Sequence, residues 1–362
     1  MIVANNTALI KPVSALCPMN CSYCFYNDIA NHRETFSYPK MTESTLDLII
    51  NLYTAKASDS TTFLFQGGEP LMAGLNFFRH YKTSVQAIIN KRPDFKVFSS
   101  LQTSGILITQ EFARLFKEMN FLIGISLDGT EAIHNENRKL KNGNGSFKKV
   151  MHGISLLKEN NVDFNILTVI NKTNVTKAAT LWNFFKEEDI KFLQFIPALA
   201  SIEKPGCLVS SDEYADFMLN IFDLWSKDLF AGHYVSVRFI DDLFAKLTHK
   251  AVTSCDMQGH CTNQNVIEAD GSIYPCDFYV LDKYRLGSVF DLKNPDNSVI
   301  LNEFIKGVPV ASQCASCNLF NLCKGGCKRY REEDNSAFLC KTYKSLFTKR
   351  AATIQKVLNL LT

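Results

Sequence analysis

Short apolar runs alternate with amphipathic stretches through the first 200 residues of the chain. The apolar runs have the length and the β-branched and aromatic content of buried strands. The sequence predicts six of them, at 8–15, 62–66, 96–102, 122–127, 163–169 and 191–196. Between them, apolar residues three or four positions apart indicate helices, which we expect at 43–53, 77–89, 110–119 and 147–158.

This strand–helix alternation predicts an α/β fold with a mostly parallel sheet and helices outside it. Six such units fit an open, partial (β/α)6 barrel of the TIM type, in which functional side chains gather where the strands end. Three short polar motifs follow that rule, because they end the second, third and fourth predicted strands. They are QGGEP at 66–70, QTSG at 102–105 and SLDG at 126–129.

The pattern changes after residue 205, and four regions are predicted: the barrel (1–205), a connecting helical region (206–250), a cysteine-rich domain (251–345) and a C-terminal helix (346–362). The connecting region contains two expected helices, at 211–230 and 241–249. Eight of the 12 cysteines lie between residues 255 and 340, where apolar content is low. A segment with so little core needs bound metal to fold.

Composition and charge argue against several classes of protein. The 362 residues carry a formal net charge of +3, with basic residues scattered along the chain, so nucleic acid is not an expected partner. The first residues lack the basic start and apolar run of a signal peptide, and no apolar run is long enough to span a membrane. We therefore expect a cytoplasmic protein, whose cysteines bind metal and do not form disulfides.

The first cysteine motif lies just after the first predicted strand and consists of Cys17, Cys21 and Cys24. Three thiolates on one loop can ligate three irons of a 4Fe–4S cluster and leave the fourth iron open to another ligand. Tetrahedral zinc is the alternative, but it would need a fourth ligand, and the nearest imidazole is His32. The spacing, with two aromatic residues directly after it, favours the cluster.

Here the sequence resembles the radical S-adenosylmethionine (radical SAM) superfamily, whose motif is C-x3-C-x2-C followed by an aromatic residue. The GGEP segment at 67–70 is similar to the glycine-rich motif of that superfamily. The resemblance implies that the open iron chelates S-adenosylmethionine (AdoMet) and reduces it to a 5′-deoxyadenosyl radical. It also implies that the glycine-rich motif holds the methionine amino group.

The second set of cysteines provides eight further ligands, enough for two fully ligated 4Fe–4S clusters or for a pair of zinc sites. Their spacing resembles that of the SPASM domain. This resemblance implies two interleaved sets of ligands. One auxiliary cluster is expected on Cys255, Cys261, Cys276 and Cys327, and the other on Cys314, Cys317, Cys323 and Cys340. The remaining thiol, Cys207, is expected to be an ordinary buried or loop residue.

Four segments closely resemble the anaerobic sulfatase-maturating enzymes: CFY at 24–26, QGGEP at 66–70, FLQF at 192–195 and the stretch from Cys276 to Leu286. The resemblance extends from Ile10 to the closing helix. It implies oxygen-independent oxidation of a cysteine or serine, in a sulfatase motif of the form Cys/Ser-x-Pro-x-Arg, to Cα-formylglycine. The implied partners are that sulfatase polypeptide and an electron donor, reduced flavodoxin or ferredoxin. The implied cofactors are AdoMet and three 4Fe–4S clusters.

In the implied reaction the adenosyl radical removes a hydrogen atom from the substrate β-carbon, and Asp277 removes the thiol or hydroxyl proton as general base. The remaining electron passes to the auxiliary clusters, and a thioaldehyde intermediate is hydrolysed. The family's AdoMet contacts fall on Tyr26, Gly68, Ser126, Arg138 and Leu199. From the residues alone, Leu199 would be a packing residue, Arg138 a surface ion pair and Asp277 a turn residue.

Two segments depart from the family pattern. Ser104 stands where asparagine is common, and residues 197–205 match poorly near the expected substrate entry. Two alternative functions follow. A SPASM-type maturase that crosslinks a ribosomally made peptide would commonly carry an additional recognition domain of roughly a hundred residues, but 16 residues precede Cys17. A zinc-stabilised binding module without catalysis would be colourless, whereas a cluster protein is brown.

Overall fold

The computed structural model describes residues 6–204, 206–291, 296–306 and 308–361. Packing divides the chain into two compact units. The first unit comprises Met1–Ser126, Arg138–Phe164 and Thr262–Ile305, and the second comprises Leu127–Asn137, Asn165–Cys261 and Lys306–Thr362. Residues 262–305 thus group with the N-terminal strands. The predicted domain boundaries, which were drawn from sequence pattern, stay a prediction.

The first unit is built on a mostly parallel sheet with strand order β12-β11-β10-β1-β3-β4-β5. Parallel pairs join β1 to β10, β1 to β3, β3 to β4 and β4 to β5, whereas β10–β11 and β11–β12 are antiparallel. These strands are β1 (Thr7–Ile10), β3 (Ser60–Phe65), β4 (Lys96–Thr103), β5 (Leu122–Ser126), β10 (Val266–Ile267), β11 (Ser272–Tyr274) and β12 (Gly287–Ser288).

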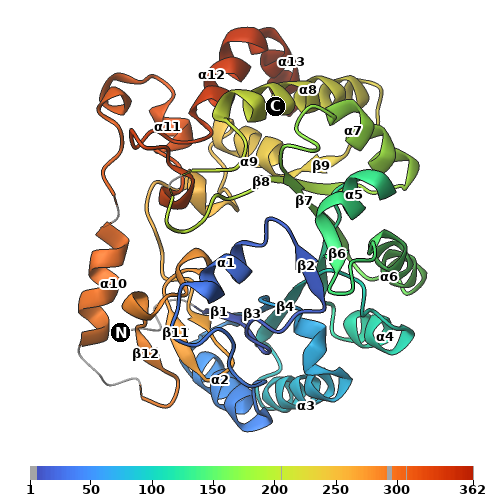
Figure 1. Cartoon of the computed structure of the whole chain (residues 1–362), viewed down its shortest axis with the longest axis vertical. Coiled ribbons are helices and arrows are strands. Elements are labelled where there is room, and N and C mark those ends of the chain that lie inside the picture. Colours follow the sequence, from blue (N-terminus) through green and yellow to red (C-terminus); the bar gives the residue numbers. More distant parts are fainter. Residues whose placement is uncertain (1–5, 205, 292–295, 307, 362) are drawn as a thin grey trace. The chain divides into compact units, whose positions relative to one another are not determined.

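Helices of the first unit lie along the outside of this sheet, where α2, α3, α4 and α6 are neighbours in turn (Figure 1). The helices are α1 (Phe25–Asn31), α2 (Glu43–Lys56), α3 (Leu75–Lys91), α4 (Gln110–Glu118) and α6 (Phe147–Glu159). A separate antiparallel pair, β2 (Met19–Cys21) with β6 (Arg138–Leu140), was not predicted. α10 (Asp296–Lys306) ends at the unit boundary.

The core of the first unit forms where the alternating faces of the strands meet the helices. In β3 every second residue is buried, and Phe65 packs edge-to-face on Phe78 and Tyr81 at centroid distances of 5.3 and 5.0 Å. Each such side chain contributes about 1.5–3 kcal/mol when fully buried, with edge-to-face contacts adding to that. Helix α2 begins at Glu43 because the Thr42 hydroxyl caps it, accepting from the Thr45 N–H at 3.1 Å.

The first strand is shorter than the predicted range 8–15. It ends at Ile10, because Pro12 lacks an N–H for the ladder and the chain turns at Ser14, which has a φ of 51°. The Ser14 N–H donates to the Lys11 carbonyl at 3.4 Å within this turn. Lys11 therefore stands at the carboxyl end of a strand, where functional residues gather in parallel α/β sheets.

The second unit contains three parallel strands in the order β7-β8-β9 and a set of helices. The strands are β7 (Phe164–Ile170), β8 (Phe192–Pro197) and β9 (Ser236–Val237); the helices are α5 (Glu131–Asn137), α7 (Ala178–Glu187), α8 (Ser211–Phe230), α9 (Arg238–Leu247), α11 (Phe320–Cys323), α12 (Cys340–Lys349) and α13 (Ala351–Leu361). Helix α8 begins as predicted, with a capping box between Ser210 and Glu213.

The chain ends in two helices where the sequence predicted one. α12 stops and α13 starts around Arg350, whose φ of −129° leaves the helical region. The Arg350 guanidinium is held by both carboxylate oxygens of Asp223 on α8, at 2.5 and 2.6 Å. This bidentate pair fixes the break against a long helix of the same unit.

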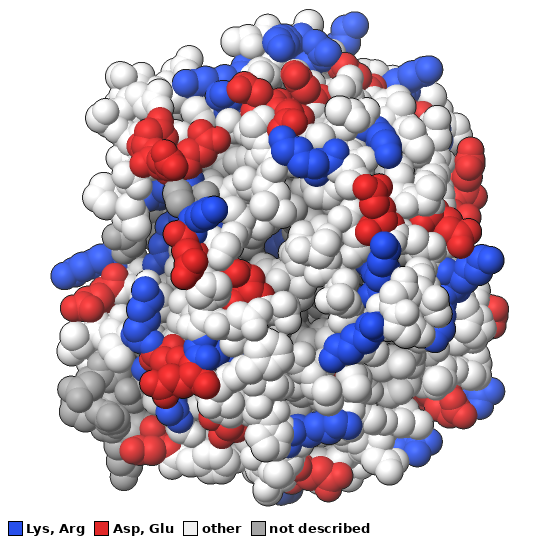
Figure 2. All heavy atoms as spheres, viewed as in Figure 1, with Lys and Arg blue, Asp and Glu red and all other residues white. Residues whose placement is uncertain are grey.

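Both units show the predicted α/β class, with mostly parallel strands and helices on their faces. In the described part of the chain, no helix combines the length and apolar character needed to cross a bilayer. Basic and acidic side chains are intermingled over the face drawn in Figure 2, as the small net charge suggests.

Candidate active site

The first three cysteines lie between β1 and α1 in the first unit, with Cys21 at the end of β2 and Cys24 directly before α1. Two of their sulfurs already accept backbone N–H groups: Cys17 from Met19 and Cys24 from Asn27, each at 3.4 Å. Burial raises the pKa of Cys17 to about 12, and the neighbouring Cys21 and Cys24 thiolates add to that rise. Bound iron would favour the thiolate form of these cysteines over the thiol.

The glycine-rich motif packs directly on this cysteine loop. Gly68 has a φ of +55°, and a Cβ at this position would lie 2.7 Å from the Ser14 carbonyl oxygen and closer still to that of Leu16. The Glu69 N–H donates to the same Leu16 carbonyl at 2.9 Å. Glycine is therefore required here by close backbone approach, and the two predicted AdoMet motifs form one continuous surface of the first unit.

Glu69 is a buried carboxylate, 1% exposed, that is satisfied by hydrogen bonds. One oxygen accepts from the Thr103 hydroxyl at 2.7 Å, and the other accepts from the Ser104 N–H at 2.8 Å and the Ser104 hydroxyl at 2.5 Å. Ser104, which departs from the family pattern, therefore serves to hold Glu69. Through Glu69 the end of β4 is fixed to the glycine-rich motif.

The other residues predicted to contact AdoMet lie in different local environments. The Ser126 hydroxyl, at the end of β5, accepts from the Gln102 amide at 3.1 Å. Arg138 pairs across strands with Cys21 and is 7% exposed, so its interpretation as a surface ion pair is wrong. Leu199 lies in the second unit, half-buried, in a bridge with Cys207. Their role toward AdoMet stays a prediction.

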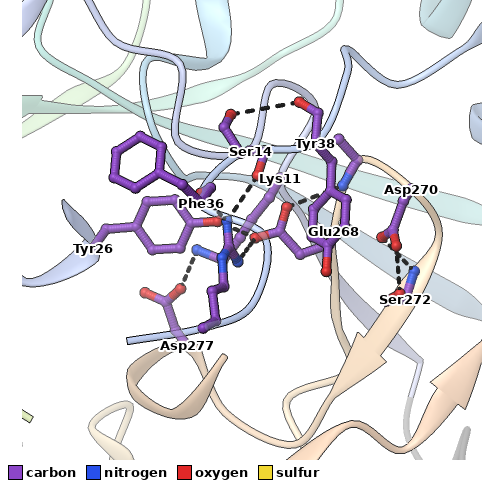
Figure 3. A network of polar contacts seen from close by, with 12 residues as sticks. Lys11, Ser14, Tyr26, Phe36, Tyr38, Glu268, Asp270, Ser272 and Asp277 are labelled. Carbon is purple, nitrogen blue, oxygen red and sulfur yellow. Dashed lines mark hydrogen bonds and ion pairs between the residues drawn. The ribbon is translucent and has the colours of Figure 1, made fainter. Parts of the chain in front are cut away.

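Asp277 begins a 3₁₀ turn directly after Cys276 and β11, in the first unit, and is 6% exposed. Its carboxylate forms an ion pair with Lys11 through one oxygen and accepts from the Gln66 amide at 2.5 Å through the other (Figure 3 shows the Lys11 contact). Its own N–H donates to the Gln264 side-chain oxygen at 3.0 Å. The interpretation as a simple turn residue does not account for these contacts.

A second buried charge lies beside the first, at Glu268 (Figure 3). The Tyr26 hydroxyl donates to this carboxylate, and Arg33 donates to it at 2.7 Å and to the Ser14 hydroxyl at 2.9 Å. Burial raises the pKa of Tyr26 well above its ordinary value, and the Glu268 charge raises it further. The hydroxyl of Tyr26 is thus engaged within the protein, while its ring faces the Lys11 ammonium at 3.9 Å.

Aromatic packing joins the cysteine loop to the Asp277 turn. Phe25, the first residue of α1, packs edge-to-face on Phe278 at 5.1 Å between ring centroids. Since Phe25 follows Cys24 and Phe278 follows Asp277, this contact packs the end of the cysteine motif against the turn that carries the acid. Such pairs contribute about 0.5–1.5 kcal/mol beyond buried area.

Seven cysteines of the second unit belong to the predicted auxiliary ligand sets, and the eighth is Cys207. Burial raises the pKa of Cys314, Cys323 and Cys340, and the negative charge of neighbouring cysteines raises it further. Burial likewise raises the pKa of Cys255 and Cys327, which are coupled to each other and to Cys261. The assignment of these thiols to two interleaved ligand sets, which the SPASM resemblance implies, stays a prediction. Cys276, the remaining member, belongs to the first unit.

The donors around these thiols fit iron–sulfur clusters. The Arg329 N–H donates to the Cys327 sulfur at 3.4 Å. The Arg329 side chain is 4% exposed and donates to the Ala200 carbonyl, while its Nε has no partner among the described residues. A buried donor without a partner is rare in folded proteins, and cluster sulfur would accept from it. In the described ranges, no three His, Cys, Asp or Glu side chains are arranged to hold a single metal ion.

The sequence analysis missed three charged residues of this site: Lys11, Arg33 and Glu268. One signal was present, because Lys11 falls inside the predicted apolar strand 8–15, where an unpaired charge is costly. Arg33 and Glu268 are 235 positions apart in the sequence, and no local pattern joins them.

Comparisons with known proteins agree with this geometry. The Radical SAM superfamily model matches residues 12–181. The chain is 40% identical to the cysteine-type anaerobic sulfatase-maturating enzyme of Clostridium novyi (96% of each chain). It is 32% identical to the serine-type enzyme of Bacteroides thetaiotaomicron (94% of this chain, 88% of that one). The solved structure of native anSMEcpe with bound AdoMet and Cp18Cys peptide matches with a TM-score of 0.90 at 37% identity, over 98% of this chain and 99% of that one.

Proposed function

Since the chain belongs to the family of anaerobic sulfatase-maturating enzymes, we propose that it oxidises a cysteine of a sulfatase polypeptide to Cα-formylglycine without oxygen. The observation that carries this proposal is the Asp277 carboxylate. It is buried, directly follows the cluster ligand candidate Cys276, and is held by Lys11 and Gln66. A carboxylate at this position would accept a proton from a substrate group, while the adjacent cluster would accept an electron from the same group.

Three sets of thiols would hold three 4Fe–4S clusters. The first would be bound by Cys17, Cys21 and Cys24, with one iron left for AdoMet. The other two would have four protein ligands each: Cys255, Cys261, Cys276 and Cys327 for one, and Cys314, Cys317, Cys323 and Cys340 for the other. When bound, these groups and AdoMet supply hydrogen-atom removal from the substrate β-carbon and an acceptor for the electron left behind.

Residues of the chain itself would bind AdoMet and accept the substrate proton. Gly68, fixed against the cysteine loop, presents its backbone to the methionine end of AdoMet, and Glu69 keeps that backbone in place through Thr103 and Ser104. Asp277 accepts the proton of the substrate thiol. Each carboxylate oxygen retains a second lone pair after its contact with Lys11 or Gln66. The proton can therefore arrive without breaking either contact.

Cysteine is the better supported target residue. Three cysteine-type relatives are each 40% identical to the chain, whereas the serine-type relatives are 30–32% identical. The solved structure in the comparison carries AdoMet and a Cp18Cys peptide. A Cys-x-Pro-x-Arg segment of a sulfatase is therefore the substrate that we propose, with reduced flavodoxin or ferredoxin as electron donor.

The peptide-crosslinking alternative receives less support, since the relatives that match the chain over nearly their whole length carry sulfatase-maturating names. The zinc-module alternative leaves Asp277, Lys11 and Gln66 without a purpose.

The test is to incubate the reduced, iron-reconstituted enzyme anaerobically with AdoMet and two short peptides, Cys-x-Pro-x-Arg and its serine counterpart. We expect mass spectrometry to show the aldehyde from the cysteine peptide and a slower reaction of the serine peptide. A crosslinked or unchanged cysteine peptide, with AdoMet cleaved, would refute the proposal.

A further inference from the structure

Lys11 carries a charge that is entirely removed from solvent, with a side-chain exposure of 0%. Burying an ammonium costs several kcal/mol unless partners compensate it. Two partners do so: the Asp277 carboxylate, as an ion pair, and the face of the Tyr26 ring, 3.9 Å from Nζ. The Glu268 carboxylate nearby is already occupied by Tyr26 and Arg33.

The stem of Lys11 passes the first glycine of the glycine-rich motif. A Cβ on Gly67 would lie 2.8 Å from the Lys11 Cγ and 3.1 Å from its Cδ and Nζ, and Gly67 has a φ of +110°. Glycine is thus required at this position both by its backbone conformation and by the path of the lysine. Lys11 consequently touches three motifs that are far apart in sequence: the aromatic after the cysteines, the glycine-rich motif and the acid.

We propose that Lys11 is a positioning residue for the oxidation. It fixes the orientation of the Asp277 carboxylate relative to Tyr26 and the glycine-rich motif. The inference rests on the proposed role of Asp277 as the base. Positioning requires a fixed geometry, and Lys11 supplies it from the end of a core strand. Proton transfer goes from the substrate sulfur to Asp277, and the Lys11 ammonium keeps its own protons.

A double-mutant cycle of Lys11→Met and Asp277→Asn tests this directly. Aldehyde and 5′-deoxyadenosine are measured in the same reaction with the cysteine peptide. We expect Lys11→Met to lower the ratio of aldehyde to deoxyadenosine by about 10- to 100-fold, while deoxyadenosine formation stays within about threefold of the unmodified enzyme. In the Asp277→Asn background, Lys11→Met should lower the ratio no further. Additive losses would overturn the inference.

Two further variants keep the test decisive if Lys11→Met folds poorly. Lys11→Arg keeps the charge and a donor, so it should recover a clear part of the ratio; recovery no better than Lys11→Met would contradict the role. Gly67→Ala should lower the ratio by displacing the lysine stem. Its matched control is Gly74→Ala, also at positive φ (+94°) but with nothing within 4 Å of the added methyl; equal losses in the two would contradict the role.

Failure of this inference can be told apart from failure of the proposed function. If the unmodified enzyme makes no aldehyde, the proposed function is wrong, and the double-mutant cycle cannot be interpreted as positioning of a base. If it makes aldehyde and the cycle is additive, the function stands and Lys11 has only a structural role.

Discussion

The two cysteine regions differ in how extensively other parts of the protein surround and hold the cysteines. The loop of Cys17, Cys21 and Cys24 is surrounded by strand ends, buried carboxylates and close backbone contacts, all within the first unit. The cysteines of the second unit lie in short helices and turns, such as α11 (Phe320–Cys323) and the 3₁₀ turn at Ser312–Ser316. From this difference we expect the second region to depend more on bound metal for its order than the first does.

The largest expected effect is at the first region. In Cys17→Ala, Cys21→Ala, Cys24→Ala enzyme, AdoMet cleavage should vanish, because the cluster whose open iron would bind AdoMet is lost. Iron content should remain about two thirds of that of the unmodified enzyme, as eight thiolates still bind two clusters. Iron analysis and chromatography of deoxyadenosine measure the two quantities. Complete loss of iron would mean that the later cysteines hold no clusters.

At the second region, we expect a substitution to abolish aldehyde formation but not AdoMet cleavage. Cys323→Ala should remove one cluster, leaving about two thirds of the iron, and should abolish aldehyde formation while AdoMet is still cleaved. Limited proteolysis should then cut the segment 308–340 faster, because the cluster stabilises it. Cys207→Ala is the matched control and should keep the full iron content. If the Cys323 variant resisted protease like the control, the comparison would fail.

Ser104→Ala should have a moderate effect confined to the first region. It removes the hydroxyl that donates to Glu69 at 2.5 Å but leaves the Ser104 N–H in place. A hydrogen bond to a charged group contributes about 1.5–3 kcal/mol, so we expect AdoMet to bind about tenfold more weakly, with iron content unchanged. Equilibrium dialysis with labelled AdoMet measures the affinity. Unchanged affinity would show that the Thr103 hydroxyl and the backbone N–H groups of Leu71 and Ser104 hold Glu69 well enough.

The smallest effect is expected at Lys246, on α9 of the second unit. Its ammonium donates to the carbonyls of Met257 and, at 2.5 Å, Leu322, next to two of the cysteine loops. Lys246→Met should speed iron release to a chelator about fivefold, the equivalent of losing about 1 kcal/mol. Lys250→Met, at an exposed position nearby in the sequence, is the control. If iron were released at the same rate from both variants, the Lys246 contacts would not help to retain the cluster.

Much of the fold follows from sequence pattern, because strong local signals agree there. Helix α8 has a capping box and a regular apolar face, and its bounds were predicted without error. The pairing of β10 with β1 could not be predicted, because Val266 and Leu9 are brought together by tertiary packing of a two-residue strand. β10 is too short to show a periodic pattern, whereas the apolar run that contains β1 was predicted.

The candidate site shows the same division. The cysteines and the glycine-rich motif carry spacing signals, and Asp277 was identified through its resemblance to the family. Lys11, Gln66 and Glu268 act through contacts between distant segments, so their roles emerge only in three dimensions. The place of Ser104 could be interpreted only once its hydroxyl was seen to bond Glu69.

The central claim is that Cys17, Cys21 and Cys24 leave one iron free for AdoMet. Electron–nuclear double resonance on the reduced enzyme, with AdoMet carrying ¹⁵N in its amino group, tests it most directly. We predict a ¹⁵N coupling to a reduced 4Fe–4S cluster, absent from the triple-alanine variant. A fully iron-loaded enzyme that shows no such coupling would contradict the account.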